Sequence, residues 1–82
     1  MKLELYYFES CPFCQKVLIY LEDKKHDIIF FDTRIHFEYR EKLFKINGRT
    51  QVPCLIVNDE PMLESDEIMS FLDQNKQKWI QA

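Results

Sequence analysis

A Cys-Pro-Phe-Cys tetrapeptide at residues 11–14 stands between a strand-like segment and a helical one, and this junction constrains the fold most. Residues 3–8 are rich in aromatic and aliphatic side chains, which is typical of a strand. From Cys14 to Leu21, apolar residues recur at the i, i+3, i+4, i+7 spacing of one helix face. Pro12 suits the first helical position, because its missing N–H has no intrahelical partner there. The chain should therefore begin with a strand that delivers a dithiol to a helix N-terminus.

The remaining elements are predicted from shorter patterns. We expect a strand at 28–31, a helix at about 36–46, a strand at 52–57, a returning strand at 60–63 and a last helix capped by Ser65. The first two strands should be parallel, because a helix joins them, and the last two should form a hairpin. The predicted fold is a single α/β domain over residues 1–82. Its four-stranded mixed sheet is flanked by three helices in the order β-α-β-α-β-β-α.

Composition excludes several classes of protein. The 82 residues suffice for one core, and 46% of them are hydrophobic. A net charge of −3 without a long basic cluster argues against nucleic-acid binding. No apolar run has the length of a membrane span, and the first residues lack the features of a signal peptide. We therefore expect a cytoplasmic monomer that binds neither nucleic acid nor membrane.

The two cysteines of the tetrapeptide should differ in chemistry. Cys11 would lie at the helix N-terminus, where free backbone N–H groups and the helix dipole stabilise a thiolate. We therefore expect Cys11 to be exposed, acidic and nucleophilic. Cys14, one turn later on the apolar face, should be buried and less acidic. Such a pair could attack a disulfide with one sulfur and resolve the mixed disulfide with the other.

Metal binding is the main alternative for this cysteine pair. Structural zinc takes four ligands, and the other candidates are Cys54, His26 and His36. These residues lie at no recognisable ligand spacing, so we expect no metal site. Cys54 follows Pro53 directly and is interpreted as a small buried strand residue, although a third redox thiol is the alternative.

The sequence resembles the glutaredoxins, small glutathione-dependent proteins of the thioredoxin-fold group, over essentially its whole length. The resemblance rests on Cys11-Pro12-Phe13-Cys14, on residues 48–53 (Gly-Arg-Thr-Gln-Val-Pro) and on Glu64-Ser65-Asp66. It departs from the common pattern at Phe8, where many members have a lysine, and at Phe13, where a tyrosine is usual. The pair Glu64-Ser65 looks more like the corresponding pair in N-terminal domains of glutathione transferases.

The resemblance implies a glutathione site with defined contacts. The Val52–Pro53 bond would be cis, and the Val52 backbone would pair with the cysteinyl backbone of glutathione. Ser65 and the last helix would bind the γ-glutamyl carboxylate, while Asp66 or Glu64 would bind the ammonium group. The implied glutathione-binding residues are Phe13, Arg49, Gln51, Val52, Pro53, Glu64, Ser65 and Asp66, of which Arg49 would take the place of the missing lysine charge.

The implied activity is reduction of protein–glutathione mixed disulfides and other disulfides, with Cys11 and Cys14 catalytic and glutathione as co-substrate. No cofactor would be bound. The partners would be glutathione and proteins that carry glutathionyl groups or disulfides. Three alternatives stay open: a thioredoxin-like electron donor that does not use glutathione, a binding module for glutathione or an iron–sulfur cluster, and a detached transferase-like domain.

Overall fold

Four strands and four helices follow one another along residues 1–81, which are the residues that this computed structural model describes. In chain order they are β1 (Leu3–Tyr7), α1 (Pro12–Glu22), β2 (Ile29–Asp32), α2 (Phe37–Asn47), β3 (Cys54–Val57), β4 (Glu60–Leu63), α3 (Ser65–Gln74) and α4 (Lys76–Trp79). The predicted element order is confirmed up to α3. The three helices predicted to flank the sheet are α1, α2 and α3, and the short helix α4 that follows them was not predicted.

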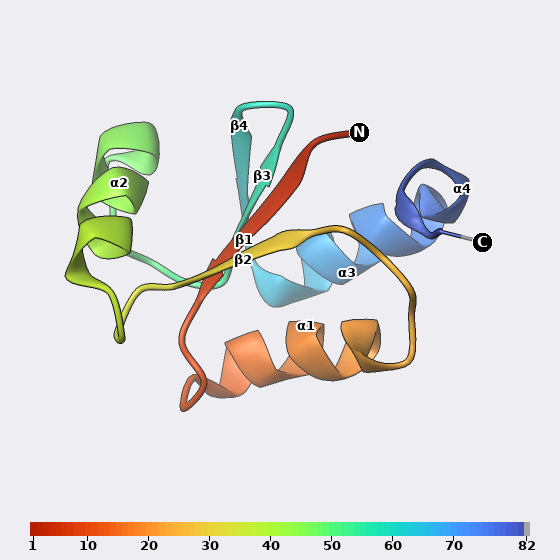
Figure 1. Cartoon of the computed structure of the whole chain (residues 1–82), viewed down its shortest axis with the longest axis horizontal. Helices are drawn as coiled ribbons and strands as arrows, with labels where there is room; N and C mark the ends of the chain where they lie inside the picture. The colour runs from red at the N-terminus through yellow and green to blue at the C-terminus, as the bar shows by residue number, and fades with distance from the viewer. Residues whose placement is uncertain (82) are drawn as a thin grey trace.

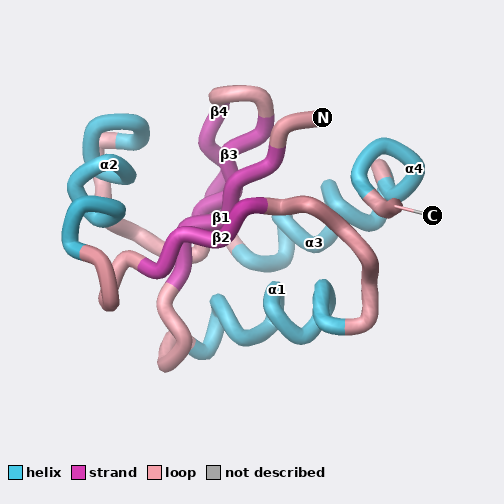
Figure 2. Tube along the Cα trace, in the orientation of Figure 1, coloured by secondary structure: helices cyan, strands magenta, loops and turns pink. Residues whose placement is uncertain are grey.

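The strands form one mixed sheet in the order β2-β1-β3-β4 (Figure 2). β1 pairs with β2 in parallel and with β3 antiparallel, and β3 and β4 form the expected antiparallel hairpin. The hairpin turns at Asn58 and Asp59, whose φ angles are 48° and 75°. A tight turn of this kind needs positive φ at both central residues, and Asn and Asp tolerate that conformation well.

Helices cover both faces of the sheet, with α1 and α3 on one face and α2 on the other (Figure 1). Alternation along the strands produces this division, because successive side chains point to opposite faces. On β1, Leu5 packs toward α1 and α3, whereas Tyr6 packs toward Leu43 of α2. The α2 side of the sheet is the smaller core, and Leu43 is the one buried residue of that helix.

The C-terminal segment docks on the domain through Trp79. Trp79 is 3% exposed, and its indole Nε1 donates a hydrogen bond to the carbonyl of Leu72 at 2.7 Å. Helix α4 escaped prediction because its four residues are too few to show a helical period. Among residues 1–81, no helix combines the length and apolar character that crossing a membrane would require.

Candidate functional site

Cys11 caps the N-terminus of α1. Its backbone is extended, with φ −80° and ψ 118°, and its Sγ accepts a hydrogen bond from the backbone N–H of Cys14 at 3.3 Å. The N–H of Cys11 donates to the carbonyl of Phe8 at 3.2 Å, which ties the turn to the end of β1. Pro12 occupies the first helical position, as predicted. The sulfur thus lies where helix N–H groups are otherwise unpaired and can stabilise negative charge.

The expectation that Cys11 is exposed is wrong, since only 7% of the residue is accessible. Its side chain turns back over the first turn of α1 to accept the Cys14 N–H, so the sulfur does not project into solvent. Pro12 and Phe13 are the exposed residues of the motif, and 59% of the Phe13 surface is accessible.

Cys14 is fully buried, as expected. Burial raises the pKa of its thiol to about 12, and the hydrogen bond with Cys11 and the negative charge of Asp32 act in the same direction. Cys14 therefore stays protonated at neutral pH. The two cysteines therefore differ, because the Cys11 sulfur lies at the helix N-terminus and the Cys14 thiol stays protonated. A two-step exchange requires such an asymmetry.

Cys54 is also fully buried, in β3 on the side of the sheet that faces α2. Burial raises the pKa of its thiol to about 11. Its position supports the packing interpretation. Among the residues that the structure describes, no three His, Cys, Asp or Glu side chains gather as ligands of a metal ion.

These differences predict which thiol an alkylating reagent modifies first. At pH 7.5 the thiolate, which is the reactive species, should be scarce at Cys14 and Cys54 because their pKa values lie at about 12 and about 11. Iodoacetamide should modify Cys11 well before the other two in the folded protein, while all three should react in denaturant. Peptide mapping by mass spectrometry measures this order, and modification of Cys54 at the rate of Cys11 would contradict it.

A cleft of about 340 Å³ lies between the Val52–Pro53 loop and the start of α3. It brings together seven of the eight residues predicted for a glutathione site: Phe13, Gln51, Val52, Pro53, Glu64, Ser65 and Asp66. The Val52–Pro53 peptide bond is cis, as the family resemblance implied. Pro53 also delays the third strand, which begins at Cys54 and not at residue 52.

The prediction that Ser65 caps α3 is wrong. Glu64 occupies the N-cap position, and Ser65 is the first residue of the helix. Glu64 has a φ of 73°, which turns the chain sharply, and its carbonyl accepts the N–H of Ile68 at 3.0 Å. Ser65 is 6% exposed, and its hydroxyl forms no hydrogen bond with another residue of the described chain. The hydroxyl and the free N–H groups of the first turn are thus available to an anion in the cleft.

Arg49 is the predicted residue that does not line the cleft. It lies exposed just beyond the α2 C-cap, Gly48, whose φ of 75° ends the helix. No sequence motif pointed to Arg34, whose guanidinium lies 4.0 Å from the Phe8 ring centre and donates to Ser10 Oγ at 3.1 Å. The parallel pairing of β1 with β2 brings these segments together, so the predicted topology contained the signal.

The fold and these motifs define a thioredoxin-like α/β domain. A model of the family described as "Glutathione S-transferase, N-terminal domain" matches residues 5–78. The chain therefore belongs to the family of glutathione S-transferase N-terminal domains. No curated protein matches it.

Solved structures support the same class. A glutathione S-transferase from the Antarctic clam Laternula elliptica is 30% identical, with a TM-score of 0.73 over 95% of this chain and 36% of that one. A trimeric glutathione transferase from Leishmania is 32% identical, with a TM-score of 0.72 over 92% of this chain and 17% of that one. A glutaredoxin from Brucella melitensis shares the fold at 19% identity, with a TM-score of 0.63 over 94% of this chain and 84% of its own. The chain thus spans roughly a third or less of the two transferases and most of the glutaredoxin's length.

Proposed function

We propose that this domain is a glutathione-dependent thiol–disulfide oxidoreductase that acts through Cys11 and Cys14. The observation that carries the proposal is the asymmetric dithiol at the N-terminus of α1, beside a cleft with a free serine hydroxyl. One sulfur accepts a helix N–H, and the other is held protonated by burial. A domain that only bound glutathione would have no use for the second thiol.

The proposed reaction transfers a glutathionyl group in two exchanges. The Cys11 thiolate attacks the glutathione sulfur of a mixed disulfide, which forms a Cys11–glutathione bond and releases the substrate thiolate to take up a proton. A second glutathione, as thiolate, then attacks the glutathione sulfur bound to Cys11. Oxidised glutathione leaves and Cys11 returns as thiolate, so the substrate sulfur is reduced and the one incoming glutathione is oxidised, joined in a disulfide to the glutathionyl group taken from the substrate.

For a disulfide within a protein, Cys14 would take the place of the second glutathione. Cys11 forms a mixed disulfide with one substrate sulfur, and the Cys14 sulfur then attacks Cys11 as it loses its proton. The product is a Cys11–Cys14 disulfide and a substrate dithiol. Two glutathione molecules would then reduce that disulfide again.

The cleft offers complementary groups for glutathione along its length. The Val52 backbone can pair with the cysteinyl residue in the manner of an added strand. The Ser65 hydroxyl and the N-terminus of α3 suit the γ-glutamyl carboxylate. The exposed carboxylates of Glu64 and Asp66 suit its ammonium group.

A glutathione-conjugating role is the second candidate, and the family match favours it. Conjugation needs one activated glutathione thiolate and an electrophile, but it does not use a resolving thiol. Two turnover rates would decide between disulfide reduction and conjugation: one with a glutathionyl mixed disulfide and one with chlorodinitrobenzene as the electrophile. The dithiol geometry predicts measurable turnover of the disulfide, and turnover of the electrophile alone would establish the second candidate instead.

Replacing Ser65 by alanine should weaken glutathione binding without destabilising the fold. One hydrogen bond to a charged acceptor is worth about 0.5–3 kcal/mol, so the apparent KM for glutathione should rise by roughly 2- to 160-fold. The hydroxyl caps no helix N–H, so the melting temperature should stay within about 2 °C of the original value. Steady-state kinetics and thermal melts measure the two quantities. An unchanged KM would place the γ-glutamyl carboxylate elsewhere.

A further inference from the structure

A second depression is lined by residues of α2. Helices α2 and α4 lie at opposite sides of the domain (Figure 1). The depression consists of two adjoining hollows of about 410 and 430 Å³, which share Phe37, Arg40 and Thr50. We call this surface the α2 groove. Its lining residues are Phe8, Thr33, Arg34, Phe37, Arg40, Glu41, Phe44, Lys45 and Thr50.

The α2 groove combines exposed aromatic rings with positive charge. Phe37 and Phe44 have 62% and 56% of their surfaces accessible, and both rings line the same hollow, which makes the exposed apolar surface contiguous there. Arg40 and Lys45 form no ion pair within residues 1–81. The charged residues that line the groove are three cations, Arg34, Arg40 and Lys45, and one carboxylate, Glu41. The groove is therefore positive, although the net charge of the chain is −3.

The groove adjoins the turn that carries Cys11. Phe8, which lines it, accepts the backbone hydrogen bond of Cys11. Arg34 reaches across to Ser10, the residue before Cys11. Thr50 lies at the groove and its neighbour Gln51 lines the cleft. A chain that presents a disulfide to Cys11 can therefore extend along α2.

We propose that the α2 groove binds the segment that flanks the reactive cysteine of a substrate protein, and that this segment is acidic and carries one large apolar side chain. The inference rests on the proposed function and specifies its substrate class. The apolar side chain would pack on Phe37 and Phe44, and the carboxylates would pair with Arg40 and Lys45. A charge pattern of this kind steers the encounter and selects among partners.

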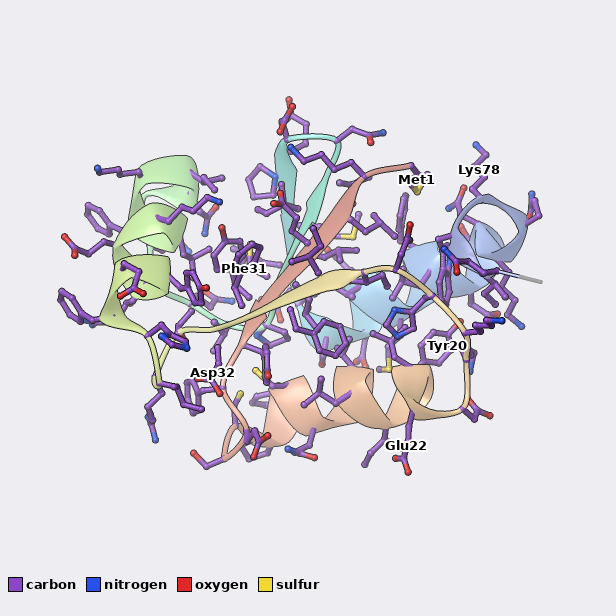
Figure 3. All side chains as sticks on the ribbon, in the orientation of Figure 1. Met1, Tyr20, Glu22, Phe31, Asp32 and Lys78 are labelled. Carbon is purple, nitrogen blue, oxygen red and sulfur yellow. The ribbon has the colours of Figure 1, made fainter. Side chains whose placement is uncertain are left out.

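The test compares peptides that differ only in charge. Two peptides would each carry one glutathionylated cysteine and one phenylalanine, flanked by aspartates in one and by lysines in the other. The enzyme variants are Arg40→Glu with Lys45→Glu, and Lys78→Glu as a charge control on α4, far from α2 (Figure 3). A small neutral disulfide serves as the substrate that cannot reach the groove.

The original protein should favour the acidic peptide in kcat/KM by about tenfold at low ionic strength, and added salt should reduce that preference. The double variant should lose or invert the preference but keep its rate on the small disulfide. Lys78→Glu should change neither. Phe44→Ala should slow turnover of both peptides and leave the small disulfide unaffected, because it removes apolar contact and no charge.

An unchanged charge preference in the double variant would overturn the groove assignment, and so would an equal effect of Lys78→Glu. If the small disulfide is not reduced at all, the proposed function fails. Fluorescence anisotropy of unglutathionylated peptides then tests the groove alone, with tighter binding of the acidic peptide expected. Sedimentation equilibrium tests whether a second copy of the chain occupies the groove instead. If the original protein forms dimers and the double variant does not, the groove is a dimer interface and the proposal is overturned.

Discussion

Replacing Cys11 by serine should abolish reduction of both glutathionyl mixed disulfides and protein disulfides. The sulfur at the α1 N-cap is the only group in the proposed reaction that attacks the substrate, and a serine hydroxyl is a far weaker nucleophile. We expect kcat/KM to fall by roughly three orders of magnitude or more, as losses of a nucleophile do in other enzymes. A glutathione-coupled assay with each substrate measures the effect.

The matched change, Cys14→Ser, should separate the two reactions. Glutathione itself resolves the Cys11–glutathione intermediate, so deglutathionylation should persist. Reduction of protein disulfides should be lost, because the buried second thiol is then absent. Equal loss of deglutathionylation in both variants would contradict this division of roles.

Replacing Leu43 by alanine should produce the largest loss of stability that we predict. Leu43 is the one buried residue of α2, and it packs against Tyr6 and Ile56 in the smaller core. Burial of this side chain holds α2 to the sheet, so its truncation should lower the free energy of unfolding by about 2–5 kcal/mol. Urea denaturation followed by circular dichroism measures that change.

The neighbouring residue provides the control for that experiment. Phe44 is larger than Leu43 but 56% exposed, and Phe44→Ala should change the free energy of unfolding by no more than about 0.5 kcal/mol. If both substitutions cost the same, α2 is not held mainly through Leu43. The pair also separates stability from docking, because only Phe44 lines the α2 groove.

The sequence predicts the fold well because its signals are local. The Cys-Pro-Phe-Cys junction indicates a strand followed by a helix, and Asn58-Asp59 indicates a tight hairpin; both are found. Helix α4 has no such signal, since four residues show no period. Its place is determined by the docking of Trp79 on α3, which is a tertiary contact.

The candidate site is predictable as a set of residues but not in its local geometry. The cleft gathers seven of the residues that the resemblance implied. The burial of Cys11 depends on a rotamer that turns its sulfur toward the Cys14 N–H. The shift of the α3 cap to Glu64 depends on a positive φ that non-glycine residues rarely adopt. Neither feature has a pattern in the sequence.

An NMR titration of the ¹⁵N-labelled chain with S-methylglutathione, an analogue that cannot exchange disulfides, tests directly whether glutathione binds in the cleft beside Cys11. We expect amide shifts at Phe13, Val52 and Ser65 that saturate together with one dissociation constant, because these residues line one cleft. The amides of Phe37 and Phe44, in the outer part of the α2 groove, should move little. Saturating shifts at those two positions, or none at the cleft, would contradict the claim that glutathione binds beside Cys11.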